Sequence, residues 1–256
     1  MDAQSQNGDN RVAPWEAERL RLTVFLTPAA TLPSAELWEQ VIGEAPDKKV
    51  EQPRIGAMQC EGPFSSGKLV LRVQPARIDW LYVPSDEIDI ESSLPPVVGS
   101  FDDAMEDFVP RMKQWLGTNS DVQRLAFGPI LDRFVQDHQS GYQCLNSLLS
   151  AVEVDPTTSD FRYQINRPRR AESVPGDMRI NRLSTWSVRA WKVVPVTPQG
   201  MNLSGAGVTA KYGCHLDLDI STDAERVEDF PQDVLEPLLE ELISLAKEIS
   251  EEGDIP

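Results

Sequence analysis

The feature that most constrains this chain is an order of expected elements that runs twice along it: strand, helix, three strands, helix. In the first pass, residues 20–27 (LRLTVFLT) form an apolar run that Pro28 ends, which predicts a strand. Ser34 stands where a helix N-cap is expected, and apolar residues recur at helical spacing until Gly43. Further strands are then expected at 54–61, 68–75 and 77–83, and a helix at about 100–116.

The second pass repeats this order with different residues. The expected elements are a strand at 122–131, a helix near 141–152, strands at 161–166, 182–194 and 212–220, and a closing helix at 233–250. Both closing helices carry an apolar stripe at a spacing of three and four residues, which predicts the face that each one buries. The stripes are Phe101, Met105, Phe108, Met112 and Trp115, and Leu235, Leu238, Leu239, Leu242, Leu245, Ala246 and Ile249.

The two passes share their element order but no pattern of individual residues. The order predicts an α+β fold of two similar halves, each an antiparallel sheet with helices packed on one face. The expected boundaries are a disordered N-terminal segment at 1–16, a first half at 17–118 and a second half at 119–256. A single irregular α+β domain is the competing interpretation.

The lengths of the apolar runs and the number of cysteines indicate the cellular compartment in which the protein is expected. No apolar run approaches the roughly 20 residues that a membrane-spanning helix needs, and residues 1–14 do not resemble a signal peptide. Cys60, Cys144 and Cys214 are odd in number and widely spaced, which disfavours a disulfide framework or a zinc knuckle. We therefore expect a cytoplasmic protein with reduced thiols and no membrane association.

Charge is strongly segregated within a net value of −17. Residues 79–107 carry nine acidic side chains and no Lys or Arg, and residues 215–256 have a net charge of −12. Between them, residues 161–192 have a net charge of +6. A chain this acidic repels phosphate backbones overall, so general nucleic-acid binding is disfavoured.

The basic segment at 161–192 has three possible roles. Its arginines could stack on and neutralise single-stranded nucleic acid, because Phe161, Tyr163, Trp186 and Trp191 lie among them. They could instead dock on an acidic surface, either of the protein's own helices or of a partner, or they could be solvated turn residues. The candidate binding residues are Arg162, Arg167, Arg169, Arg170, Arg182 and Arg189.

The strand at 214–221 offers a candidate metal site. Strand side chains alternate between faces, so His215, Asp217 and Asp219 share one face and Leu216 and Leu218 the other. Two carboxylates and an imidazole in a row can hold a divalent cation for phosphoryl-transfer chemistry. The competing interpretation is a half-buried strand whose polar face meets water.

Nucleophilic catalysis finds little support. The chain has two histidines, His138 and His215, to serve as a base. Cys214 adjoins His215 but points to the opposite face of the same strand, so these two side chains cannot share a proton. We expect no catalytic residue and no cofactor.

Residues 124–130 (RLAFGPI) as an opening strand, and 216–220 (LDLDI) before an acidic C-terminal helix, resemble a sporadically distributed family of uncharacterised bacterial proteins of about this length. That family has no established activity. The resemblance implies a bacterial, cytoplasmic, two-part α+β protein.

These patterns together favour a non-enzymatic protein-binding module. Two acidic stretches can steer a basic partner by long-range attraction, as in an inhibitor or regulator of a basic effector protein. The alternative is a metal-dependent enzyme acting on a phosphorylated or nucleotide substrate. In that enzyme, Asp217, Asp219 and His215 would hold the metal, and arginines of the basic segment would hold phosphate.

Overall fold

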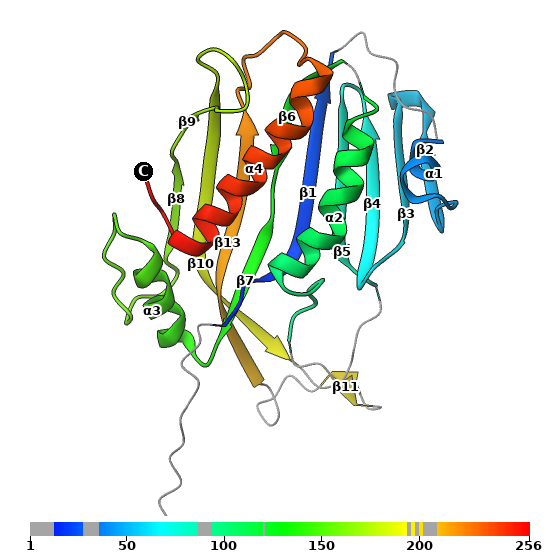
Figure 1. Ribbon diagram of the computed structural model, residues 1–256. Coiled ribbons are helices and arrows are strands. Elements are labelled where there is room, and N and C mark those ends of the chain that lie inside the picture. Colours follow the sequence, from blue (N-terminus) through cyan, green and yellow to red (C-terminus); the bar gives the residue numbers. More distant parts are fainter. Residues whose placement is uncertain are drawn as a thin grey trace, which may run out of the picture.

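A computed structural model describes residues 13–27, 36–86, 94–119, 121–193, 196–197, 200–201 and 209–256. The chain has an α+β fold built on one large antiparallel sheet (Figure 1). Its earlier strands are β1 (Glu16–Leu26), β2 (Lys48–Gln52), β3 (Ala57–Phe64), β4 (Gly67–Gln74) and β5 (Arg77–Pro84). Its later strands are β6 (Val122–Phe127), β7 (Ile130–Val135), β8 (Arg162–Asn166), β9 (Arg169–Arg170), β10 (Arg179–Val193) and β13 (Thr209–Thr222).

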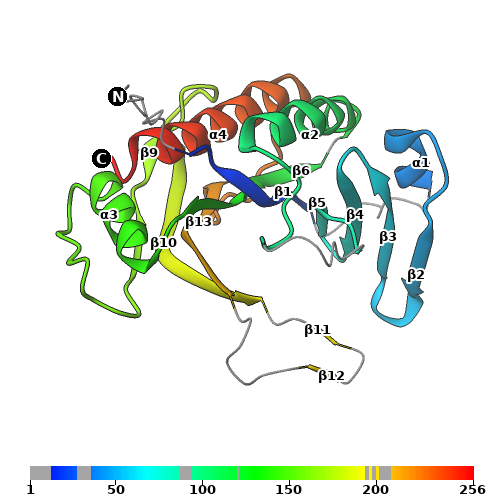
Figure 2. The ribbon, with the colours of Figure 1, turned by 90° about the horizontal axis from the view of Figure 1, so that it is seen from below.

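All of these strands belong to a single 11-stranded sheet in the order β2-β3-β4-β5-β1-β6-β13-β10-β8. Like β6, β7 lies between β1 and β13 and pairs with both of them. β9 pairs with β10. The early and late strands therefore meet where β1 lies beside β6 and β7, and they form one continuous sheet. A separate pair, β11 (Val196–Thr197) and β12 (Gly200–Met201), lies beyond the ends of β10 and β13 (Figure 2).

Four helices in the described residues pack on one face of this sheet: α1 (Glu36–Ile42), α2 (Phe101–Leu116), α3 (His138–Leu148) and α4 (Gln232–Glu252). α2 and α4 lie side by side over the central strands, whereas α1 and α3 lie toward opposite edges (Figure 2). None of the described helices covers the other face. None of them is long and apolar enough to span a membrane.

The core lies between this helix layer and the sheet. The predicted apolar stripes of both closing helices are confirmed, since every one of those side chains is buried. Trp80 of β5 contacts Trp38 of α1 and Trp115 of α2, with ring centroids 6.0 and 5.7 Å apart. The predicted cap of α2 is confirmed as well, because Ser100 accepts a hydrogen bond from the Asp103 amide. Ser34, the other expected cap, lies outside the described residues.

Some boundaries differ from the expected ones. The expected strand at 122–131 ends at Phe127, and after Gly128 and Pro129 the chain continues as β7, which pairs with β1 and β13. β2 was not expected, because all of its residues are exposed and show no alternation. The folded part also begins before residue 17, since Trp15 is buried and donates a hydrogen bond to the Ser250 carbonyl at 2.6 Å.

Candidate functional site

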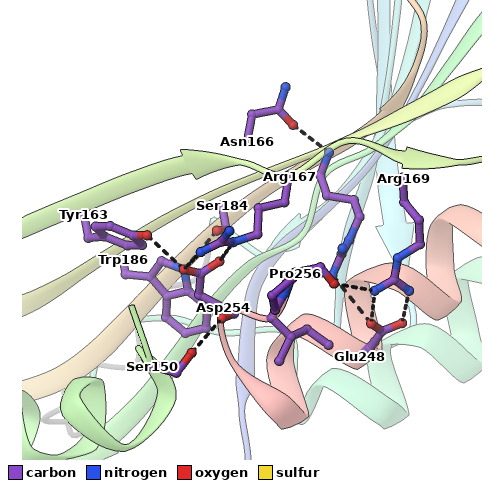
Figure 3. A network of polar contacts seen from close by, with 12 residues as sticks. Ser150, Tyr163, Asn166, Arg167, Arg169, Ser184, Trp186, Glu248, Asp254 and Pro256 are labelled. Atoms are coloured by element: carbon purple, nitrogen blue, oxygen red, sulfur yellow. Dashed lines mark hydrogen bonds and ion pairs between the residues drawn. The ribbon is translucent and has the colours of Figure 1, made fainter. Parts of the chain in front are cut away.

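Much of the basic segment docks on the C-terminal end of α4 (Figure 3). Arg167 donates two hydrogen bonds to the Asp254 carboxylate, at 2.6 and 3.0 Å, and Tyr163 donates a third at 2.9 Å. Asp254 is buried. Burial opposes its ionisation, but the hydrogen bonds from Arg167 and Tyr163 hold the pKa of this carboxyl below its usual value.

A second contact lies next to the first. Arg169 forms a bidentate pair with Glu248 of α4, with nitrogen–oxygen distances of 2.9 and 2.7 Å. Arg182 is buried, with its Nη2 atom 3.5 Å from Glu248. Burial, followed by the nearby Arg169 charge, lowers the pKa of Arg182. Planar guanidinium groups suit such bidentate contacts with carboxylates.

The six arginines predicted to bind a ligand therefore do not form one surface. Arg167, Arg169 and Arg182 hold the protein's own C-terminal segment, which matches one form of the docking interpretation. Arg170 is exposed and donates to the Gly176 carbonyl. Arg162 is exposed at the edge strand β8, and Arg189 of β10 pairs with Glu18 at 2.7 Å.

Part of each acidic stretch lies in the helix layer. α2 and α4 contact each other, and their outward faces carry exposed acidic side chains. We call this surface the acidic helix layer. It consists of Asp102, Asp103, Glu106 and Asp107 on α2 and Asp233, Glu236, Glu240, Glu251 and Glu252 on α4.

Few cations oppose these carboxylates. Lys113 of α2 contacts Glu240 and Glu236 of α4, and Lys247 of α4 lies 2.7 Å from Asp102. Asp79 does not belong to this surface, because it is buried in β5 and pairs with Arg77 at 2.8 Å. Glu87, Asp89 and Glu91 lie outside the described residues.

The face of the sheet that the helices leave uncovered is lined by the strand side chains that alternate with the buried ones. As predicted for the strand at 214–221, Cys214, Leu216, Leu218 and Ile220 are buried beneath the helices. His215, Asp217 and Asp219 therefore point to the uncovered face. Arginines reach the same face from neighbouring strands, and Arg124 lies over the Phe25 ring at 4.8 Å.

His215, Asp217 and Asp219 have different surroundings on this face. Asp217 is exposed, and Asp219 lies 3.6 Å from Arg21 of β1. The Arg21 guanidinium occupies the space above Gly128, where an added Cβ would be 2.7 Å from its Nη2 atom. His215 is buried and lies 2.9 Å from Asp132 of β7.

A different group contains His215. The ligand atoms of Glu18, Asp132 and His215 all lie within 4.8 Å of one another. These residues come from β1, β7 and β13, which are neighbours in the sheet, and Asp132 stands directly opposite His215 in the register. Sequence spacing gave no signal for this group, because it depends on strand pairing between distant segments.

Cys214 lies on the opposite face of β13 from His215, as expected. Cys214 donates to the Gly141 carbonyl of α3 at 3.1 Å, on the face opposite His215. The neighbouring Cys144 thiol and burial raise the pKa of Cys214, so it stays protonated. His138 packs edge-on against Tyr142, with ring centroids 4.7 Å apart.

No protein-family model, curated protein or solved structure matches this chain.

Proposed function

We propose that this protein is a non-enzymatic binding module whose acidic helix layer receives a basic partner protein. The observation that carries the proposal is that the parts of the two acidic stretches on α2 and α4 lie side by side with their carboxylates exposed. A partner with a basic face would be attracted over several ångströms and oriented by this field. An inhibitor or regulator of a basic effector protein would act in this way.

The internal pairing of the basic segment supports the same proposal. Arg167 and Arg169 are paired with Asp254 and Glu248 at the C-terminal end of α4. These arginines therefore neutralise carboxylates outside the acidic helix layer, whose own carboxylates are contacted by Lys113 and Lys247. A basic partner would supply the missing positive charge.

We also propose that the chain is a duplicated unit. The strand order supports this, since β3-β4-β5-β1 on one side is matched by β8-β10-β13-β6 on the other, with β1 and β6 in contact. β2, which pairs with β3 at the first edge, is an additional strand of the first half. In such a duplication α2 and α4 are equivalent closing helices, which would bring two acidic helices together into one surface. Free cysteines at 60, 144 and 214 are consistent with action in the cytoplasm of a bacterium.

Capture from an extract of the cells that make this protein tests the proposal. We expect a basic protein to be retained by the immobilised chain at 0.1 M NaCl and released at 1 M, because the Debye length falls from about 10 Å to about 3 Å across that range. Capture of nothing, or of a protein that stays bound at 1 M NaCl, would contradict the proposed electrostatic contact.

A further inference from the structure

The uncovered face of the sheet holds a group of side chains that lies on the opposite side of the sheet from the acidic helix layer and takes no part in the proposed partner binding. Asp132 and His215 are almost fully buried, at 1% and 3% exposure, although they lie on the face that none of the described helices covers. Among the described residues, the only hydrogen bond of the Asp132 side chain is the one with His215. A buried carboxylate is unfavourable unless a positive charge or a metal ion partners it, and a bound cation would meet that need.

Glu18 brings a second carboxylate to the same place. The register of β1 against β7 shifts between Ala17 and Arg19, so Glu18 lies in a β-bulge. Bulges re-aim side chains, and here the bulge leaves Glu18 beside Asp132 and His215. Arg189 donates to the Glu18 Oε2 atom at 2.7 Å, which orients the carboxylate. Carboxylates that bind metals are commonly held in this way by an outer hydrogen bond.

We propose that Glu18, Asp132 and His215 form a binding site for a divalent transition-metal cation, with zinc as the cation that fits best. One imidazole nitrogen and two carboxylate oxygens are ordinary zinc ligands, at about 2.0–2.2 Å from the ion. Two ligand atoms of one tetrahedral ion are then about 3.4 Å apart. The Glu18 side chain is 38% exposed and can close the remaining gap.

Three protein ligands leave the fourth position of a tetrahedral ion for water. That arrangement is typical of zinc sites that do more than hold a fold together. The site is independent of the proposed partner surface, because it lies on the opposite face of the sheet. It also differs from a site built on Asp217 and Asp219, which lie farther along β13 and outside this group.

Zinc titration of the chelator-treated full chain tests this site. We expect one zinc ion per chain, and a melting temperature that rises by about 5 °C at a zinc concentration about 100 times Kd. Asp132→Asn and His215→Gln should abolish the rise. Glu18→Gln changes a half-exposed residue and should leave the metal-free fold intact, yet it should weaken zinc binding by about tenfold or more.

The double variant Asp217→Asn with Asp219→Asn is the matched control, and it should keep the wild-type response to zinc. Cobalt absorption provides a second measurement that does not depend on stability, since bound cobalt should show the visible bands of a four-coordinate site. The proposal is overturned if the wild-type chain does not respond to zinc. It is also overturned if the control loses the response while Glu18→Gln and Asp132→Asn keep it, because the ion would then lie on the acidic pair of β13.

Discussion

The two faces of the molecule use charge in different ways. On the acidic helix layer, exposed carboxylates of α2 and α4 outnumber the cations that contact them, Lys113 and Lys247. On the uncovered face of the sheet, opposite charges pair, as in Arg21 with Asp219 and Arg189 with Glu18. An unopposed field attracts a partner from a distance, whereas paired groups act at contact. The unpaired negative charge of this chain, whose net charge is −17, therefore lies more on the acidic helix layer than on the uncovered face of the sheet.

The largest effect that we predict concerns the contact that holds the C-terminal end of α4 to the basic segment. Asp254→Asn should lower the free energy of unfolding by about 3–5 kcal/mol at pH 7, because it leaves the Arg167 guanidinium without its buried partner. Urea denaturation measures this change. Asp177→Asn, at a side chain that is 96% exposed, is the control and should change stability by less than about 0.5 kcal/mol.

The pH dependence of the same contact follows from the lowered pKa of Asp254. Its carboxylate stabilises the folded state above the unfolded pKa of about 3.9, and this contribution is lost as pH falls through the lower folded value. The stability difference between wild type and Asp254→Asn should therefore stay constant from pH 7 to about pH 5 and shrink below about pH 4. A difference that disappears above pH 5 would mean that the contact is not ionic.

The next effect tests how closely the C-terminal end of α4 packs against α3. Gly253→Ala should cost about 2 kcal/mol or more, because Gly253 has a φ of +84° and an added Cβ would lie 2.0 Å from the Leu148 carbonyl oxygen. Gly43→Ala is the matched control, with a φ of +87° and nothing within 4 Å of an added Cβ. Gly43→Ala should lower the free energy of unfolding by about 1 kcal/mol. If both variants lost the same stability in thermal unfolding, the close packing of α4 on α3 would be refuted.

A smaller effect is expected at the start of α2. Ser100→Ala removes the side chain that caps this helix, and it should lower the free energy of unfolding by about 1 kcal/mol. Ser100→Asp, which preserves an acceptor at the cap, should restore most of the loss in the same denaturation experiment. Equal stability of all three proteins would show that the acidic start of α2 is held by packing alone.

The smallest effect belongs to the uncovered face. Asp217→Asn should change the free energy of unfolding by less than about 0.5 kcal/mol, because the residue is exposed. A loss above about 1 kcal/mol would show that Asp217 is needed for the fold and would weaken the contrast between the two faces.

The parts of the fold that sequence predicted are those with a strong local period. The stripes of α2 and α4, and the alternation of β13, follow from the spacing of apolar residues, and burial confirms them. β2 was missed because its residues (KKVEQ) are all exposed and only pairing with β3 defines it. Glu18 and Asp132 were missed for a related reason, since only the register of β1, β7 and β13 brings them to His215.

The most direct test of the proposed function compares two variants of equal net charge. Glu106→Gln, Glu236→Gln, Glu251→Gln and Glu252→Gln together remove exposed carboxylates from the acidic helix layer, whereas Glu44→Gln, Glu153→Gln, Asp160→Asn and Asp177→Asn remove the same number of exposed ones elsewhere. The affinity of each variant for the basic protein captured at 0.1 M NaCl is then measured by titration. We expect the first variant to bind about tenfold more weakly or worse, and the second to bind within about twofold of wild type. Equal weakening of both would show that net charge, and not the acidic helix layer, holds the partner.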